Sequence, residues 1–252
     1  MKPLILFFVL ALHTHIVLGQ QKEKEDEMYV DMPDESEETN VLKKGEGQVE
    51  TAFLHNKYKE GPHSSISQLL VRYGAGRRVE LRILSEQGNH LHRYIEETVQ
   101  STYPLSIGTK ILLVEGEKAK PSIAFVGYLN LPVTIHGKSK DHLTPIFLAA
   151  FQNEFTEKFK LEYNGGIQQS AFSKEWSELV NASVHYKLLD PLEVFFEFFA
   201  QYQHHASPEN NLGGGVAYQF AKNLEFYVSG GRTIGQSEYN RFISGGLAIR
   251  IR

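Results

Sequence analysis

The sequence predicts an all-β fold: a transmembrane antiparallel up-and-down β-barrel of about 12 strands. Three observations predict it. From residue 47 onward, segments of about ten residues alternate between apolar and polar side chains, charges recur on the polar side, and short turns separate the segments. Successive side chains of a strand point to opposite faces, so each segment has one charged and one uncharged face. Because the uncharged face is large and aromatic, the pattern favours lipid outside the barrel and water inside.

Residues 1–19 are expected to be a secretory signal peptide. Met1 and Lys2 form a short positive start, residues 4–12 form an apolar run, and small or tolerated residues precede a cut at Gln20. This order is typical of signal peptides. Together with the barrel pattern, it predicts the bacterial cell outer membrane. An even number of strands would place both the N-terminus and the C-terminus in the periplasm.

Residues 20–46 are expected to be an acidic, disordered periplasmic leader. Asp and Glu dominate residues 20–40, and this stretch has too little apolar surface to fold alone. Two alternatives remain open: the leader docks to a periplasmic partner, or it enters the barrel as a plug. The outer-membrane β-barrel itself is predicted to comprise residues 47–252.

The individual strands follow from the alternation and from the turns between them. Tight turns, which we assign to the periplasm, are expected at 74–76, 155–157, 189–191 and 221–223, and all but 155–157 contain Gly, Asp, Asn or Pro. Two longer loops, 88–102 and 132–142, are assigned to the outside. The expected strands are 47–59, 64–73, 78–87, 103–113, 120–131, 143–154, 159–169, 175–187, 192–204, 210–220, 224–233 and 241–252.

Charged side chains recur on one face of these strands and are predicted to line the lumen. An Arg or Lys at the lipid midplane would cost about 2–4 kcal/mol, so the charges are expected to point inward. Since both signs occur, they could orient a polar or anionic solute, or they could pair and close the lumen. The predicted lumen-lining residues are Glu50, Arg72, Glu80, Arg82, Lys110, Glu162, His185, Glu193, Glu197, Glu225 and Arg250.

Enzymatic motifs are absent or weak, so the sequence does not predict an enzyme. The chain has no cysteine, and it lacks the G-x-S-x-G, H-E-x-x-H and phosphate-loop motifs. Ser183 and His185 share a face, but no third residue that would orient them is evident. A lipid hydrolase is therefore a remote alternative. The net charge of −4 gives no support for nucleic-acid binding.

Histidines gather near the strand ends that are assigned to the outside. Imidazole is a common ligand of zinc, copper and nickel. His90 and His92 share a loop, and His204 and His205 are adjacent, which makes these four weak candidates for metal ligands. Their spacing matches no tight ligand motif, so neither a metal nor a cofactor is predicted.

Several segments resemble the outer-membrane, transporter-like family known as the meta-pathway of phenol degradation. They are Leu70-Val71-Arg72-Tyr73-Gly74, Val79-Glu80-Leu81-Arg82, Pro104-Leu105-Ser106-Ile107-Gly108-Thr109-Lys110, Lys120-Pro121-Ser122-Ile123-Ala124 and Gly245-Gly246-Leu247-Ala248-Ile249-Arg250. The resemblance covers residues 47–252 and implies an outer-membrane barrel that moves small compounds, hydrophobic ones among them. It implies no catalytic residue.

The leading functional hypothesis is a channel or transporter for small hydrophobic or aromatic compounds. The alternative is a plugged structural or binding barrel that acts through its external loops. The expected partners are outer-membrane lipid, the outer-membrane assembly machinery and a small-molecule solute that the sequence does not identify. No nucleic-acid partner is expected.

Overall fold

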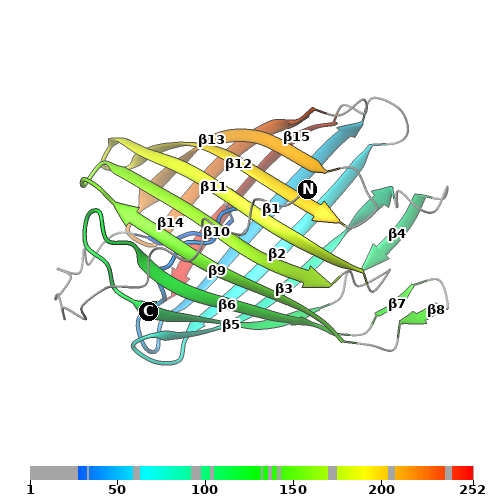
Figure 1. Cartoon of the computed structure of the whole chain (residues 1–252), viewed down its shortest axis with the longest axis horizontal. Coiled ribbons are helices and arrows are strands. Elements are labelled where there is room, and N and C mark those ends of the chain that lie inside the picture. The colour runs from blue at the N-terminus through cyan, green and yellow to red at the C-terminus, as the bar shows by residue number, and fades with distance from the viewer. Residues whose placement is uncertain are drawn as a thin grey trace, which may run out of the picture.

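The computed structural model shows a single closed antiparallel β-barrel (Figure 1). It describes residues 28–32, 34–58, 63–91, 98–102, 105–131, 133–135, 138–140, 143–169, 175–203, 208–235 and 240–251. The twelve barrel strands are β1 (Gly47–Tyr58), β2 (Ser64–Gly74), β3 (Val79–Leu91), β5 (Ser106–Val114), β6 (Ser122–Asn130), β9 (Thr144–Glu154), β10 (Phe159–Gln169), β11 (Trp176–Leu189), β12 (Leu192–Gln203), β13 (Glu209–Ala221), β14 (Leu224–Ile234) and β15 (Asn240–Ile251). Within the described ranges, no helix has the length and apolarity to cross a membrane.

Each barrel strand pairs with its neighbours in the chain, and the first strand closes the circle. β1 pairs with β2 on one side and with β15 on the other, with Gly47 opposite Ile251. Both ends of the barrel sequence therefore lie at the same rim, together with the tight turns after β2, β9, β11 and β13. The predicted up-and-down barrel is confirmed, and its strands lie close to the predicted ranges.

The two predicted long loops contain strands of their own, which the sequence analysis did not foresee. β3 continues to Leu91 and pairs there with β4 (Thr98–Thr102). β7 (Val133–Ile135) and β8 (Lys138–Lys140) form a separate hairpin. Figure 1 shows β4, β7 and β8 at one end of the barrel. Pairing of this kind satisfies backbone N–H and C=O groups where the chain leaves the wall.

The two faces of the wall differ as the alternation predicts. Phe196 is 77% exposed and Phe220 is 70% exposed on the outside, whereas Arg72, Glu80 and Lys110 are completely buried. Apolar side chains on the outside suit contact with lipid, and charges inside avoid it. The core of this barrel is therefore a polar interior rather than an apolar one.

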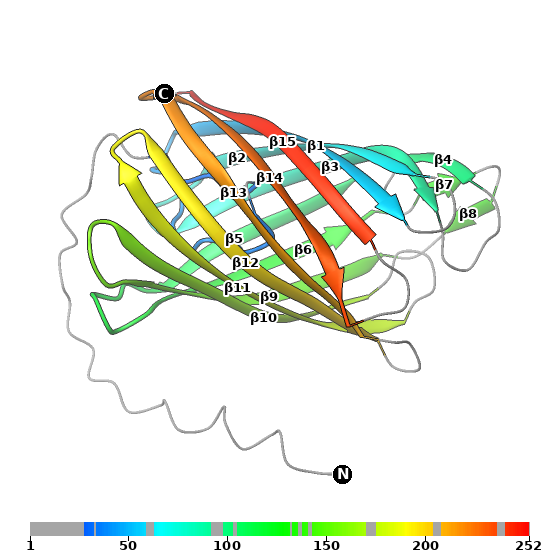
Figure 2. The same ribbon diagram turned by 90° about the horizontal axis from the view of Figure 1, so that it is seen from above.

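Residues 28–46, which we call the N-terminal segment, lie inside the barrel. Figures 1 and 2 show this segment in blue among the surrounding strands. Met28 and Val30 are buried against Ala52, Tyr227 and other wall residues. The expectation of a disordered leader is therefore wrong for residues 28–46. That expectation came from composition alone. The composition of an acidic segment contains no information about the wall residues that bind it. The predicted signal peptide, residues 1–19, and residues 20–27 lie outside the described residues.

Candidate functional site

The N-terminal segment has no regular secondary structure, and side chains of the wall accept the hydrogen bonds of its backbone. The amides of Asp31 and Met32 donate to Glu50 Oε2 at 2.9 and 3.0 Å. Further along, the backbone amides of Glu35, Glu37, Thr39 and Leu42 donate to Glu197, Asn164, Gln152 and Glu80. Burying a backbone N–H without an acceptor is costly, so these acceptors allow an irregular segment to lie inside the barrel.

Glycines fit the segment and its acceptors into the lumen at two places. Gly45 adopts a φ of 91° where the segment turns into β1, a conformation that glycine tolerates best. Gly213 on β13 faces Glu197, and a Cβ there would lie 2.5 Å from Glu197 Oε1. The glycine therefore leaves room for the carboxylate that holds the Glu35 amide.

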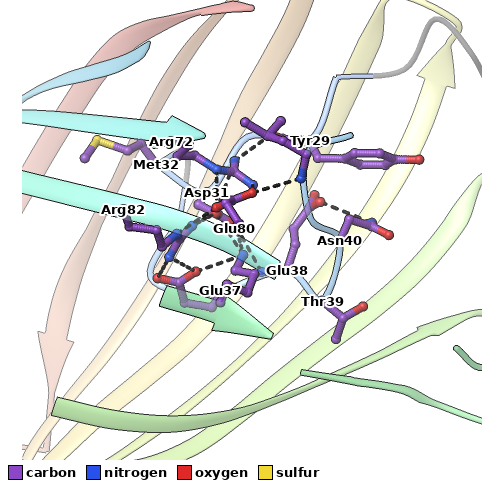
Figure 3. Close-up of polar contacts among 12 residues, drawn as sticks. Tyr29, Asp31, Met32, Glu37, Glu38, Thr39, Asn40, Arg72, Glu80 and Arg82 are labelled. Carbon is purple, nitrogen blue, oxygen red and sulfur yellow. Dashed lines mark hydrogen bonds and ion pairs between the residues drawn. The ribbon is translucent and has the colours of Figure 1, made fainter. Parts of the chain in front are cut away.

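The segment also makes ion pairs with three wall cations, Arg72, Arg82 and Lys110. Figure 3 shows Arg72 and Arg82 beside Asp31 and Glu37 of the segment. Asp31 accepts from Lys110 Nζ at 2.9 Å and from Arg82, and it lies 3.1 Å from Arg72. Glu37 accepts from Arg82 at 2.8 Å and lies 3.1 Å from Lys110 Nζ. These three cations and the carboxylates that pair with them are called the cationic cluster below. Its carboxylates are Asp31 and Glu37 of the segment and Glu50 and Glu80 of the wall.

The wall alone does not balance the charges of the cationic cluster. Its two wall carboxylates, Glu50 and Glu80, pair with Arg72 at 2.7 and 2.8 Å, and Glu80 also pairs with Arg82 at 2.9 Å. Three cations thus face two wall carboxylates, and the N-terminal segment adds two more. Because the three cations are fully buried, the segment supplies charge compensation that water cannot supply there.

A second group surrounds His185 on β11. Its Nε2 lies 2.8 Å from Ser183 Oγ and 3.1 Å from Asp34 Oδ2, and its Nδ1 lies 2.8 Å from Glu193 Oε1. Glu162 Oε2 is 3.6 Å from Nε2. Glu193 is thus the orienting third residue that the sequence analysis found missing beside Ser183 and His185. We call these five residues the histidine cluster.

The structure places all the predicted lumen residues on the inner side of the wall. Nine of them are buried: Glu50, Arg72, Glu80, Arg82, Lys110, Glu162, His185, Glu197 and Arg250. The other two, Glu193 and Glu225, line an inner cavity. Arg250 donates to the carbonyl of Lys222 at 2.7 Å. Among the four weak metal candidates, His90 lies on β3, and His92, His204 and His205 lie outside the described residues.

Residues of the N-terminal segment are not among the predicted site residues. Asp31 and Glu37 lie at the centre of the cationic cluster, and Asp34 lies at the centre of the histidine cluster. A weak signal for them exists in the sequence: Met28, Val30 and Met32 alternate with polar residues. That alternation indicates a segment with one apolar face, which is unusual for a solvated acidic leader.

Two cavities lie inside the barrel, on different sides of the N-terminal segment. The cavity that Tyr58 and Asn240 line, which we call the outer cavity, has a volume of about 320 Å³. The cavity that Asp190 and Pro191 line, which we call the inner cavity, has a volume of about 70 Å³. They share no lining residue among the described residues, although each is lined in part by the segment. The segment therefore separates the two cavities.

The outer cavity combines apolar and acidic side chains. Its apolar lining includes Leu54, Leu70, Leu84, Phe199 and Phe242, and its carboxylates are Asp31, Asp34, Glu35, Glu37, Glu197 and Glu209. Among the described lining residues, none is Lys or Arg. Enclosure by the barrel raises the pKa of Glu35 to about 7, and the neighbouring carboxylates of Asp34, Glu86 and Glu209 add to the rise. The cavity is therefore suited to neutral or cationic groups.

Comparison with known proteins identifies both a family and a fold. The family described as "Putative MetA-pathway of phenol degradation" matches residues 30–251. No curated protein sequence matches at a significant level.

Among solved structures, the COG4313 outer membrane channel from Pseudomonas putida F1 has a TM-score of 0.60 and 12% identity, covering 88% of this chain and 100% of that one. The NanC porin has a TM-score of 0.60 and 8% identity, with coverages of 79% and 98%. The TodX monoaromatic hydrocarbon channel, a deltaS2S3 mutant, has a TM-score of 0.51 and 7% identity, with coverages of 83% and 91%. The fold is that of outer-membrane porins and channels.

Proposed function

Because the chain belongs to the family described as the putative MetA-pathway of phenol degradation, we propose that it is an outer-membrane channel for small aromatic compounds. We propose further that its own N-terminal segment closes it at rest. The rim that carries Gly47, Ile251 and the tight turns would face the periplasm, and β4, β7 and β8 would lie toward the outside.

The outer cavity is the observation that supports this proposal. At about 320 Å³ it lies in the size range of small-molecule sites, which is roughly 300–1,000 Å³. Leucine and phenylalanine side chains in its lining would contact an aromatic ring, and the carboxylates would accept hydrogen bonds from hydroxyl groups. A neutral phenol offers both an aromatic ring and a hydroxyl donor. An anionic solute would be disfavoured, because the described lining has no Lys or Arg and includes carboxylates, such as those of Asp34 and Glu209, that lie outside the cationic cluster.

Passage beyond the cavity requires the N-terminal segment to move, since the segment separates the two cavities. Its apolar contacts are few: Met28 and Val30 pack against one small cluster, and most of its other contacts are hydrogen bonds and ion pairs. Each hydrogen bond adds only a modest net free energy, because water replaces it once the segment has left the barrel. Two proteins of similar fold, the COG4313 outer membrane channel and the TodX monoaromatic hydrocarbon channel, are themselves channels.

A second candidate function is a permanently plugged barrel that acts through its external loops. The complete burial of Arg72, Arg82 and Lys110 beneath the segment favours it. The two functions differ in one testable respect, which is whether displacement of the segment is needed for activity.

The test uses the absence of cysteine from the chain. Thr39 Oγ1 lies 3.1 Å from Gln152 Oε1, so a T39C/Q152C variant places one thiol on the segment and one on β9. Joining them with a short thiol-reactive linker should abolish uptake of phenol into liposomes that contain the protein, and a reducible linker should restore uptake after reduction. The single variants T39C and Q152C, treated identically, are the controls. Equal uptake by the linked and unlinked protein would refute gating by the segment, and no uptake by any form would favour the plugged barrel.

A further inference from the structure

We propose that Asp34, Glu162 and His185 form a binding site for a divalent transition-metal ion. The three residues come from different parts of the chain: Asp34 from the N-terminal segment, Glu162 from β10 and His185 from β11. A metal ion bound there would join the segment to the wall. The binding claim stands by itself, and only the consequence for gating rests on the proposed function.

The ligand atoms are spaced as a metal ion would require. One nitrogen or oxygen from each residue lies within 4.8 Å of the others. His185 Nε2 is 3.1 Å from Asp34 Oδ2 and 3.6 Å from Glu162 Oε2. Zinc binds nitrogen and oxygen ligands at about 2.0–2.2 Å in tetrahedral geometry, which separates neighbouring ligands by roughly 3.3–3.6 Å. Small side-chain adjustments would therefore complete the site.

Glu193 gives His185 the orientation that metal-binding histidines have. Its Oε1 lies 2.8 Å from Nδ1, and the imidazole stacks on Phe195 with ring centroids 5.5 Å apart. A carboxylate that accepts a hydrogen bond from Nδ1–H fixes the tautomer in which the lone pair of Nε2 is free for a metal ion. The contact of Glu193 with Nδ1 involves neither of the other two proposed ligands, Asp34 and Glu162.

The charge balance also leaves a cation missing. Glu162 is completely buried, and no hydrogen-bond donor reaches its Oε2 among the described residues. Its Oε1 lies 2.8 Å from Lys160 Nζ, which also pairs with Glu38 at 2.7 Å. Four carboxylates, from Asp34, Glu38, Glu162 and Glu193, thus contact Lys160 and His185, and Lys187 adds positive charge near Glu193. Buried carboxylates are normally paired or bound to a metal ion, and Glu162 Oε2 points toward the site without a donor.

The same residues also resemble a Ser–His–acid triad, but their electrostatics oppose hydrolysis. Ser183 Oγ lies 2.8 Å from His185 Nε2 and is completely buried. A serine hydrolase must stabilise an oxyanion beside that serine. Here the carboxylates of Asp34 and Glu162 face the same nitrogen and would repel such an anion. Negative surroundings favour a metal cation instead.

The donor set indicates the class of metal. One imidazole and two carboxylates, with a further position open to water or Ser183 Oγ, suit zinc and neighbouring first-row ions better than calcium, which prefers six to eight oxygen ligands. Because Asp34 belongs to the N-terminal segment, binding would stabilise the state in which the segment is inside the barrel.

Isothermal titration of chelator-treated full-length protein in detergent with Zn²⁺ tests the proposal. One Zn²⁺ per chain is expected. D34N, E162Q and H185Q should each abolish this binding event, and E193Q, which removes only the orienting contact, should weaken it by about 10–100-fold. H55Q, which changes a histidine outside the site, should bind as the wild type does.

Co²⁺ provides a second readout, since its visible spectrum reports nitrogen and oxygen ligation. The spectrum of the wild-type complex should be absent in D34N, a variant that leaves the wall unchanged. Zinc binding that persists in D34N and H185Q would overturn the site and indicate external histidines, and no binding by the wild type would overturn it equally. If Zn²⁺ binds but phenol uptake is unaffected by it, the metal site stands and the proposed gating fails.

Discussion

Replacing Asp31 by Asn is expected to open the barrel by releasing the N-terminal segment. The Asp31 carboxylate lies at the centre of the cationic cluster, where it contacts Lys110 at 2.9 Å, Arg72 at 3.1 Å and Arg82. Its side chain is 2% exposed. Asn keeps the size of the side chain and removes only its charge, so the variant tests the ion pairs rather than the packing.

The expected magnitude follows from the burial of these pairs. Removing one partner of a buried ion pair costs about 3–5 kcal/mol, because the other charge stays buried without compensation. When the segment leaves, water can reach the cations, so the lower value applies and docking weakens by about 3 kcal/mol. Since 1.4 kcal/mol corresponds to a factor of ten, the population with the segment released should rise on the order of 100-fold.

Two measurements check this value. Planar-bilayer recordings should show a correspondingly higher open probability for D31N, and limited proteolysis should cleave the segment faster. K110M combined with D31N should recover part of the loss, since it removes a buried cation that D31N leaves with Glu37 as its remaining partner in the segment. E157Q, on an exposed turn, is the matched control for the loss of one carboxylate. An open probability and a cleavage rate that both match the wild type would refute the assigned role of the ion pairs.

Three further perturbations have defined outcomes. The raised pKa of Glu35 means that the docked segment favours the protonated acid, so the contribution of Glu35 to docking is fully present below pH 4.5 and is lost as pH rises through about 7. Loss of this contribution should raise the open probability over this range, and E35Q should remove it. G213A would place a Cβ 2.5 Å from Glu197 Oε1 and should lower the unfolding free energy by about 1–3 kcal/mol in urea titrations. G165A is the control, because its Cβ would have no atom within 4 Å, and equal losses in the two variants would contradict the steric account. F196R puts a charge at a position that is 77% exposed on the outside of the barrel, and it should make refolding into bilayers less favourable by about 2–4 kcal/mol. F196L should have a much smaller effect. An F196R variant as stable as the wild type would argue against lipid at that face.

The barrel could be predicted from the sequence because its signal is local. Alternation along β12 assigns Phe196 to one face and Glu197 to the other without any knowledge of the neighbouring strands. Tight turns at Asp190 and Pro191 then separate one alternating segment from the next. The strands in the two long loops were missed because their pairing, such as that of β4 with β3, depends on register rather than on alternation.

The sequence left the plug as one of two alternatives for the N-terminal segment and could not select it, because the partners of the segment are distant in sequence. The amide of Glu35 binds Glu197, and the carboxylate of Asp34 meets His185. Only a closed barrel with a defined register brings such residues together. Composition also counts the acidic residues of the segment as solvated, whereas the wall offers them buried cations. For the same reason, the contact between Glu193 and His185 could not be predicted, because it arises from the pairing of β11 with β12.

The arrangement of charge connects gating to selectivity. Arg82 and Lys110 face the segment, and Lys110 pairs with Asp31 and Glu37, both of which leave when the segment moves. A released segment therefore uncovers positive charge on the wall at the same step that joins the two cavities. Acidic residues in the outer cavity favour neutral or cationic solutes, and the uncovered cations would next favour an acceptor such as a phenolic oxygen. A substitution that weakens the cationic cluster is consequently expected to change open probability and ion selectivity together, whereas one in the outer cavity alone should change selectivity only.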